Sequence, residues 1–455
     1  MEESNLEKLI ALELVRNKKF VQLKKMLQEM NPADISDLVA DMSEHDEFGE
    51  RELTLLFRIL PKELAAETFT YMDSDMQIML INAFSDNELR EVIDELYLDD
   101  TVDIIEEMPA NVVSRILKNT DNETRNQINE LLNYPKDSAG SIMTPEFVFL
   151  RKDATVAEAF ARIRKIGLMK ETVYTCYVTE NRSLVGVVTV LDMLVAEQEK
   201  LIEDIMETNV ISVFTHDDKE EVARQLSKYD LAAIPVVDAD NRIVGIVTFD
   251  DAMDVIQEEN TEDFSKMAAM QPIEESYFKT SVFVHAKKRI IWLLVLMLSA
   301  TITGMITMKF DKQISAVPIL VSFMPMLMDT GGNCGSQSAT LIIRGMALDE
   351  IRIRDFFKVV FKEFRISLIC SSVLAAVNGL RIFIQYKNLA IAFVVATSLI
   401  FTIIIAKLMG SILPMAAKKC KLDPALMAAP IITTVVDTCS ILIYFNIATK
   451  VLALV

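Results

Sequence analysis

The chain of 455 residues is long enough for two or three domains. Its charge is divided unevenly, because 58 of the 66 acidic residues but only 28 of the 46 Lys and Arg residues precede residue 281. The first 280 residues therefore carry a net charge of −30, which excludes nucleic acid and anionic membrane surfaces as expected partners and favours cations, while the remainder carries +10.

The first ten residues are acidic and lack the basic flank and apolar core of a signal peptide, so the acidic part is expected in the cytosol. The five cysteines show neither metal-ligand spacing nor a disulfide framework, and the three histidines lie far apart. The sequence also has no phosphate-binding loop and no nucleophile motif. We therefore do not expect an enzyme.

Residues 1–132 are expected to form an acidic helical domain. Residues typical of helix starts recur every 24 positions, at Pro61, Ser85 and Pro109. Helices that repeat at a fixed interval bury a continuous core only when they stack on one another. The repeat therefore predicts a helical superhelix whose surface is rich in carboxylates.

A repeat of another kind covers residues 137–260. The segment Leu184–Leu194 recurs 59 residues later as Ile243–Met253, and both copies keep a Gly, two apolar residues, a Thr and an Asp three positions further on. Each copy is preceded by a predicted helix and a β-branched run. This β-α-β-β-α pattern resembles a tandem pair of CBS domains, expected over residues 137–200 and 201–260.

Two Thr-x-x-Asp pairs belong to this repeat: Thr189 with Asp192, and Thr248 with Asp251. Each pair has the spacing of a capping box, which satisfies free N–H groups at the start of a helix. In CBS domains the same pair often holds the ribose and phosphates of a nucleotide, which helix N-termini favour. The sequence leaves both interpretations open: capping alone, or capping together with binding of ATP or another adenine nucleotide.

The acidic segment after Asp251 is expected to be helical and to continue toward Lys266. Residues 261–281 are expected to form a connecting helix between the CBS pair and an apolar C-terminal part. The alternative is an ordinary solvated linker helix.

Residues 282–455 contain five apolar stretches, expected to be the helices of an α-helical transmembrane domain in the lipid bilayer. They lie at about residues 290–308, 313–343, 366–386, 388–414 and 424–455. Five spans leave twelve Lys and Arg residues on one side and five on the other. The positive-inside rule then places the N-terminal and CBS domains in the cytoplasm and the C-terminus outside.

The second apolar stretch is interrupted at Met328–Ser338, which contains three glycines and the polar residues Asp329, Asn333 and Gln337. Irregular backbone at membrane depth is tolerated only against protein or a water-filled cavity. We therefore predict a break that exposes backbone carbonyls. A close helix contact made by small residues is the alternative.

Asp437 is the only charge between Pro424 and Thr449. It lies roughly 20 Å along a helix that starts at Pro424, well inside an apolar layer of about 30 Å. A carboxylate there is costly unless it faces a partner or water, which makes it a functional candidate. The alternative is a protonated Asp that bonds across a helix interface.

Over nearly its whole length the chain resembles the MgtE family of magnesium channels. The motifs that carry the resemblance are Gly331–Thr340 (Gly-Gly-Asn-x-Gly-x-Gln-Ser-Ala-Thr), Ile343–Gly345, Leu422–Leu426 with Pro430, and Asp437. The resemblance implies a homodimer in a bacterial-type inner membrane. It also implies an Mg²⁺-selective uptake channel whose pore is closed when cytosolic Mg²⁺ binds to the N-domain, the CBS pair and the connecting "plug" helix.

The resemblance also implies which residues attract divalent cations. The residues that we assign to the pore and its mouth are Asp437, Asp423, Asn333, Asp329 and Gln337. Asp329 departs from the family pattern, which has an apolar residue or Gly there, so its assignment rests on its polar neighbours in this chain and not on the resemblance. Those assigned to regulation are Asp99, Asp100, Asp218, Glu220, Asp230, Asp251, Asp254, Glu259, Glu262 and Asp263. For each regulatory residue, an ordinary surface carboxylate is the alternative.

Other kinds of transporter remain open at this point. A carrier could exchange Mg²⁺ against Na⁺ or H⁺, and a broader transporter could also accept Co²⁺, Mn²⁺ or Ni²⁺. A membrane-anchored nucleotide sensor is disfavoured, because it would need neither the glycine-rich segment nor Asp437.

Overall fold

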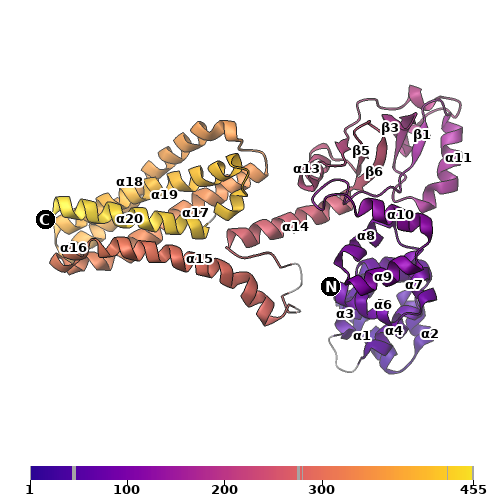
Figure 1. The fold of residues 1–455 in the computed structure, drawn as a ribbon, viewed down its shortest axis with the longest axis horizontal. Helices are drawn as coiled ribbons and strands as arrows, with labels where there is room; N and C mark the ends of the chain where they lie inside the picture. The colour runs from indigo at the N-terminus through magenta and orange to yellow at the C-terminus, as the bar shows by residue number, and fades with distance from the viewer. Residues whose placement is uncertain (1, 44–47, 274–276, 279, 428, 453–455) are drawn as a thin grey trace. The chain divides into compact units, whose positions relative to one another are not determined.

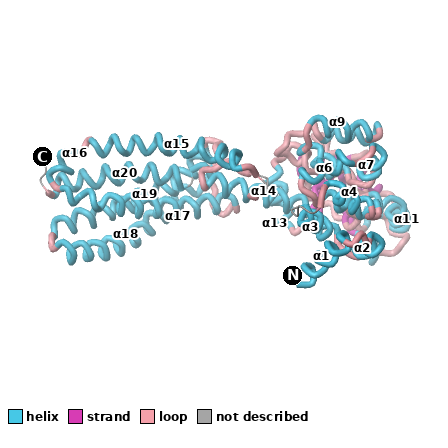
Figure 2. Tube along the Cα trace, turned by 90° about the horizontal axis from the view of Figure 1, so that it is seen from below, coloured by secondary structure: helices cyan, strands magenta, loops and turns pink. Residues whose placement is uncertain are grey.

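The computed structural model describes residues 2–43, 48–273, 277–278, 280–427 and 429–452. The chain separates into two compact units, Met1–Ile256 and Gln257–Val455 (Figure 1). In the described residues the strands belong to the first unit, and the second unit is helical (Figure 2). The expected fold class, a helical N-domain and a CBS pair followed by a helical C-terminal domain, is confirmed.

The N-domain is a stack of short helices that repeat every 24 residues. Its helices are α1 (Glu2–Arg16), α2 (Phe20–Leu27), α3 (Pro32–Ser43), α4 (Glu50–Arg58), α5 (Lys62–Thr70), α6 (Ser74–Ala83), α7 (Asp86–Ile93), α8 (Leu98–Glu107), α9 (Ala110–Asn119) and α10 (Asn122–Leu131). Pro61, Ser85 and Pro109 are the N-caps of α5, α7 and α9, as the spacing predicts. Helix α5 packs on α7 and α7 on α9, so the repeats bury one continuous core.

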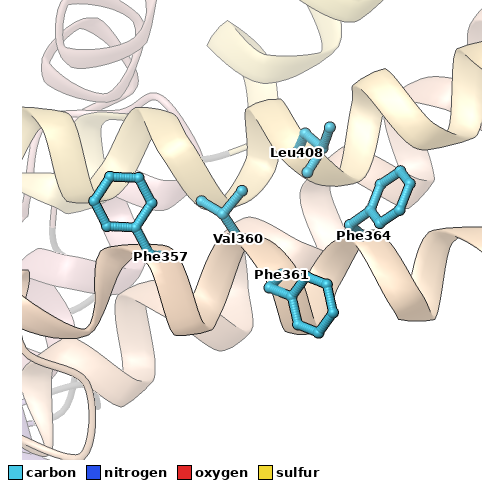
Figure 3. A pocket seen from close by; sticks show the side chains of 5 residues that line it. All are labelled: Phe357, Val360, Phe361, Phe364 and Leu408. Atoms are coloured by element: carbon cyan, nitrogen blue, oxygen red, sulfur yellow. The ribbon is translucent and has the colours of Figure 1, made fainter.

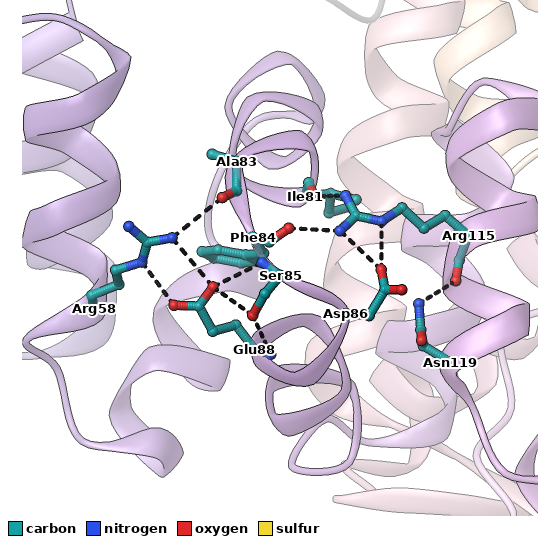
Figure 4. Close-up of polar contacts among 9 residues, drawn as sticks. All are labelled: Arg58, Ile81, Ala83, Phe84, Ser85, Asp86, Glu88, Arg115 and Asn119. Carbon is teal, nitrogen blue, oxygen red and sulfur yellow. Dashed lines mark hydrogen bonds and ion pairs between the residues drawn. The ribbon is translucent and has the colours of Figure 1, made fainter.

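Two arginines tie successive repeats of the N-domain together (Figure 4). The Nε of Arg58 donates to Glu88 Oε1 over 2.8 Å, while Nη2 of Arg115 donates to the carbonyl of Phe84 over 2.6 Å. Glu88 also accepts from the backbone N–H of its own N-cap, Ser85, over 2.8 Å. Each arginine therefore donates hydrogen bonds to groups at a helix end of the neighbouring repeat, and these bonds fix how the repeats stack.

Glu88 makes the N-domain sensitive to acid. The hydrogen bond from Arg58, followed by that from the Ser85 backbone, lowers the pKa of Glu88 to about 2. A carboxylate with a lowered pKa stabilises the fold above its ordinary pKa, and this contribution is lost as the pH falls from about 4.5 toward 2. We expect Arg58→Gln to lower the unfolding temperature at pH 6, with the difference from the unsubstituted protein shrinking toward pH 2.5.

Thermal unfolding followed by circular dichroism measures this difference. Lys62→Gln is the control, because Lys62 and Glu91 form a pair whose side chains are both more than half exposed. A deficit in Arg58→Gln that stayed constant from pH 6 to pH 2.5 would contradict the assigned role of Glu88.

The CBS pair has the predicted β-α-β-β-α order twice. Its elements are β1 (Phe149–Arg151), α11 (Val156–Ile166), β2 (Thr175–Glu180), β3 (Ser183–Thr189) and α12 (Val190–Val195), then β4 (Val213–Phe214), α13 (Lys219–Tyr229), β5 (Ala233–Val237), β6 (Ile243–Thr248) and α14 (Phe249–Met267). In each sheet the first strand pairs parallel with the second, and the second pairs antiparallel with the third. Short 3-10 turns lie at Gly167–Met169 and Ile202–Asp204.

The repeated glycines of the CBS pair are places where the two repeats approach closely. A Cβ added to Gly186 would lie 2.6 Å from the sulfur of Met206, and one added to Gly245 would lie 2.8 Å from the sulfur of Met143. Met143 begins the first repeat and Met206 begins the second. Each glycine thus lies against the start of the other repeat. A side chain would collide with the methionine there, which explains why both copies have a glycine at this position.

Helix α14 differs from the expected domain boundary. The connecting helix was expected over residues 261–281, yet α14 begins at the second CBS repeat and runs without interruption from Phe249 to Met267. The described residues that follow, up to Ser281, are not helical. The boundary expected between residues 260 and 261 therefore falls inside one helix.

The second unit is a bundle of long helices. Its elements are α15 (Val282–Met308), α16 (Asp311–Ala316), a 3-10 turn (Pro318–Phe323), α17 (Met324–Ala347), a 3-10 turn (Ile353–Asp355), α18 (Phe356–Tyr386), α19 (Leu389–Lys419), a 3-10 turn (Pro424–Met427) and α20 (Ala429–Val451). Helix α17 packs against both α19 and α20, α18 packs against α19, and α15 packs against α20. Four helices of the described part, α15, α18, α19 and α20, are long and apolar enough to cross a membrane.

The predicted break at Met328–Ser338 is wrong. This segment lies inside the continuous helix α17, and the interruption of the stretch 313–343 comes earlier, at the 3-10 turn that begins at Pro318. The glycines instead allow close packing, which was the alternative: a Cβ on Gly410 of α19 would lie 2.3 Å from the carbonyl oxygen of Gly335. The two backbones therefore touch directly.

Candidate ion path and acidic cluster

Helix α17 presents a row of polar side chains to the outside of the single chain. Asp329, Asn333 and Gln337 follow one another at intervals of four residues, so they lie on one helix face, and all three are exposed. Gly331 and Ser338, on the covered side of the same helix, are buried. We call Asp329, Asn333 and Gln337 the polar stripe.

Asp437 of α20 lies next to this stripe. Thr433, one turn earlier on α20, packs on Gly332, and the charge of Asp329 acts on Asp437. Asp437 is half-buried and makes no hydrogen bond or ion pair with any residue that the structure describes. The alternative of a carboxyl group bonded across a helix interface is therefore not seen within the described chain.

Asp423, expected at the mouth of the last helix, is held by an unexpected partner. Its Oδ2 lies 2.7 Å from the Nζ of Lys266, which also lies 2.7 Å from Glu262 Oε1. Its other oxygen accepts the backbone N–H of Ala425 over 2.8 Å and so begins the turn before α20. Burial opposes the charge of Lys266, yet its hydrogen bonds to the two carboxylates raise the pKa of Lys266.

The sequence of α14 contains a signal for this contact. Lys266 is the only basic residue of α14, where seven residues are acidic. A single cation at the end of an otherwise acidic helix is a candidate partner for a carboxylate elsewhere.

A buried charged triad supports the helix that carries the polar stripe. Ser338 Oγ donates to Glu363 Oε2 over 2.7 Å, and Lys407 Nζ lies 3.2 Å from the same hydroxyl and 3.9 Å from Glu363 Oε2. The three residues come from α17, α18 and α19 and are at most 6% exposed. Sequence reasoning missed the triad, although a lysine within an apolar stretch needs a partner.

In the first unit, carboxylates from four segments gather into what we call the acidic cluster. Its members are Asp99, Asp100 and Asp103 of α8, Glu146, Glu171, and Asp250 and Asp251 of α14. The structure thus brings together three of the predicted regulatory residues, Asp99, Asp100 and Asp251. Nothing in the local sequence of Glu146 or Glu171 marks them as members.

Burial and mutual repulsion raise the pKa of several of these carboxyl groups, so that they hold protons more tightly than usual. Burial and the charge of Asp100 raise the pKa of Asp99 to about 7. Burial raises the pKa of Asp251 to about 7. The hydrogen bond from Thr248 acts to lower this pKa, and the charge of Asp99 acts to raise it. Burial and then Asp99 and Asp251 raise the pKa of Glu171 to about 8. The cluster is therefore short of positive charge.

The acidic cluster has unused acceptors. Buried oxygens of Asp99, Glu146 and Glu171 lack a hydrogen-bond partner in the described chain. Carboxylate oxygens are the ligands that Mg²⁺ prefers, so the donor chemistry fits this ion. Among the described residues, however, no group of three or more His, Cys, Asp or Glu side chains stands close enough together to hold a metal ion as the chain lies here.

The other predicted regulatory residues lie apart from this cluster or already have partners. Asp218 is the N-cap of α13 and accepts the N–H of Glu220 over 2.9 Å, while Asp230 ends the same helix in a left-handed conformation with φ of 52°. An eleven-residue helix separates its two ends by about 16 Å. Four further predicted regulatory residues lie on α14, and one of them, Glu262, forms an ion pair with Lys266. The four are Asp254, Glu259, Glu262 and Asp263.

Both Thr-x-x-Asp pairs form hydrogen bonds of a capping box, and the first pair forms the complete box. Thr189 Oγ1 donates to Asp192 Oδ2 over 2.5 Å, and Thr189 Oγ1 accepts the N–H of Asp192 over 3.1 Å. Thr248 Oγ1 likewise donates to Asp251 Oδ2. The second pair differs in its surroundings, because Asp251 also belongs to the acidic cluster.

Three family models match the chain in consecutive segments. The MgtE intracellular N domain covers residues 46–137, the CBS domain covers residues 139–199 and 202–258, and the divalent cation transporter model MgtE covers residues 324–447. These matches follow the order of the N-domain, the CBS pair and the helical bundle.

Two magnesium transporters match the chain over almost their whole length. The magnesium transporter MgtE of Bacillus subtilis (strain 168) is 32% identical over 437 residues, which cover 96% of this chain and 95% of the relative. That of Thermus thermophilus is 34% identical over 431 residues, 94% of each chain.

Two solved structures match the first part of the chain. One is the cytosolic domain of the Mg²⁺ channel MgtE in complex with ATP, with 34% identity, a TM-score of 0.51, and coverage of 55% of this chain and 99% of that one. The other is the soluble part of a magnesium transporter, with 29% identity, a TM-score of 0.52, and coverage of 56% and 99%. The chain belongs to the MgtE family of magnesium transporters, which are membrane transport proteins and not enzymes.

Proposed function

We propose that the chain works as a homodimeric, Mg²⁺-selective uptake channel in a bacterial-type inner membrane, closed from the cytosolic side when Mg²⁺ is plentiful. The polar stripe carries this proposal. Asp329, Asn333 and Gln337 are uncovered in a bundle whose neighbouring helices are apolar enough for a membrane, with Asp437 beside them. Lipid would leave these groups without partners, so water and a second subunit are the surroundings that satisfy them.

A second protomer would form the other side of the path along the polar stripe. In a two-fold dimer the same surface patch faces itself, so Asp437 and the polar stripe of one protomer meet those of its partner across a common path. Helix α17 then serves as a fifth span, with the N-terminal and CBS domains in the cytoplasm and the C-terminus outside. This arrangement agrees with the excess of Lys and Arg on the cytosolic flanks.

Mg²⁺ suits such a path because it loses its water shell reluctantly. Carboxylates and amide oxygens can attract the hydrated ion through its water molecules, and they can release it again because they do not bind it directly. Asp437 supplies the central charge, while Asn333 and Gln337 supply neutral oxygens along the stripe.

The acidic cluster is the proposed sensor. Asp99 and Asp100 of the N-domain repel Asp250 and Asp251 of α14, and this repulsion weakens the closed arrangement when Mg²⁺ is scarce. Bound Mg²⁺ supplies the missing positive charge. Asp254, Glu259 and Asp263 extend the acidic surface along α14. Lys266, on the last turn of the same helix, forms an ion pair with Asp423, which lies just before α20. We therefore include this ion pair in the part of the chain that closes the pore.

ATP or another adenine nucleotide is a second proposed regulator. A relative's cytosolic domain was solved in complex with ATP. In this chain Thr248 and Asp251 begin α14 at the second CBS repeat, where ribose hydroxyls and phosphates could bind. Because Asp251 also belongs to the acidic cluster, nucleotide and Mg²⁺ would act on the same turn of helix.

Flux into liposomes tests this function. We expect Mg²⁺ to enter without any gradient of H⁺ or Na⁺, and internal Mg²⁺ to stop the flux. A requirement for either gradient would identify a coupled carrier instead, and equal uptake of Co²⁺, Mn²⁺ or Ni²⁺ would identify a broader transporter.

Neutralising Asp251 tests the sensor. We expect Asp251→Asn to raise the internal Mg²⁺ concentration needed for half closure at least about 5-fold, the lower end of usual allosteric coupling. Asp192→Asn is the matched control, because Asp192 forms the same capping box in the first CBS repeat but lies outside the acidic cluster. Equal shifts in both variants would assign the effect to capping and contradict the sensor.

A further inference from the structure

The start of α18 carries an open apolar groove. Phe357, Val360, Phe361 and Phe364 of α18 and Leu408 of α19 line a hollow of about 480 Å³ (Figure 3). The phenylalanines follow one another at intervals of four and three residues, so they lie on one face of the helix. Phe357 is 82% exposed and Phe361 is 63% exposed. Exposed aromatic side chains at this end of a membrane helix face lipid or another protein.

A basic row runs beside this aromatic face. Lys358, Lys362 and Arg365 each follow one of the phenylalanines by one residue, and all three are exposed. Lys358 is paired with Asp355 over 3.0 Å. Lys362 and Arg365 form no ion pair or hydrogen bond through their side chains with any residue in the described chain. Two positive charges therefore remain uncompensated next to the groove.

The acidic residue nearest in sequence cannot compensate the charges of Lys362 and Arg365. Glu363 lies between Lys362 and Phe364 in sequence but points into the protein, where it is bound by Ser338 and Lys407. The partner that matches the groove must therefore bring its own negative charge along with an apolar part.

The length of the helix places this groove at the membrane surface. The apolar helix that contains α18 runs from Ile353 to Tyr386, 34 residues, or about 51 Å at 1.5 Å per residue. The hydrocarbon layer is about 30 Å thick, so the first turns extend into the layer of lipid headgroups. Lys362 and Arg365 lie there at the depth of the phosphates, on the side where Lys and Arg gather.

We propose that this groove binds one anionic phospholipid. Its phosphate is held by Lys362 and Arg365, and an acyl chain begins along Phe364 and Leu408, at the end of the groove that lies deeper in the membrane. A second copy of the chain fits less well, because a two-fold contact would bring the basic row of one protomer against that of its partner. A neutral lipid would leave both charges unmatched.

Native mass spectrometry of the full chain in detergent tests the proposal without any transport assay, so it can fail while the proposed function stands. The probes are phosphatidylglycerol and phosphatidylcholine with identical acyl chains. We expect at least tenfold preference for phosphatidylglycerol in the unsubstituted protein. Lys362→Gln with Arg365→Gln should lower phosphatidylglycerol binding at least fivefold. Phe364→Ala should weaken the binding of both lipids.

The matched control is Lys419→Gln with Lys421→Gln. It removes the same charge on the same side, beginning about 16 Å along α19 from Leu408. We expect it to retain the preference. Equal retention of both lipids by the unsubstituted protein would overturn the proposal, as would equal losses in the two double variants. A change of oligomeric state in Phe364→Ala without loss of lipid would assign the groove to a second copy and would overturn the proposal as well.

Discussion

Asp437→Ala is expected to fold normally and to carry almost no Mg²⁺. The carboxylate is the charge nearest the centre of the last helix, it lies beside the polar stripe, and no described residue replaces it. Two copies in a dimer would lose two negative charges from the path. A loss of only about 1.4 kcal/mol of attraction already lowers ion occupancy tenfold. We therefore expect flux into liposomes to fall by more than about tenfold.

The charge, and not the shape, should decide this result. Asp437→Asn keeps the size of the side chain and should also lose flux, while Asp437→Glu should retain part of it. Asp311→Asn is the control, because Asp311 is an exposed carboxylate in the first turn of α16. The elution volume of each variant in size-exclusion chromatography checks that it is folded. Normal flux through Asp437→Asn would contradict the pore assignment.

Lys407→Met is expected to be the most destabilising single substitution in the bundle. It leaves Glu363 buried at 6% exposure with only the hydroxyl of Ser338 as a partner. Removal of one member of a buried pair usually costs about 3–5 kcal/mol, because the remaining charge has lost its compensation. Thermal unfolding in detergent should show this as a large fall in the unfolding temperature.

A second substitution should reverse most of this loss. Glu363→Met added to Lys407→Met removes the stranded charge and fills the space with apolar atoms, which is often nearly neutral for a buried pair. Lys358→Met is the control, because its pair with Asp355 is exposed and should contribute at most about 1 kcal/mol. If the double variant were no more stable than Lys407→Met, the cost would come from lost packing and not from charge.

The repeats are what the sequence predicted best. Regular spacing identified the helix starts at Pro61, Ser85 and Pro109 and the two β-α-β-β-α units, because a repeated unit appears more than once in the chain. The glycine-rich part of α17 was misjudged for a local reason. Glycine and polar residues weaken a helix in isolation, but here close contacts with Gly410 and Ile432 maintain the helix.

Contacts between distant segments could not be read from local patterns. Asp99, Asp100 and Asp251 were expected near one another from a family resemblance, whereas Glu146 and Glu171 reach the same place through the fold alone. The partner of Asp423 was missed because Lys266 lies more than 150 positions earlier. Pairing across such separations depends on tertiary packing.

The contact between Gly335 and Gly410 limits how helix α17 can move. With no side chains between the two backbones, there is nothing at this point that could bend or repack to absorb a shift. Rotation or sliding of α17 alone would drive one peptide group into the other. Any rearrangement that opens the way for an ion must therefore carry α17 and α19 as one rigid body, or leave both still and displace other parts of the protein.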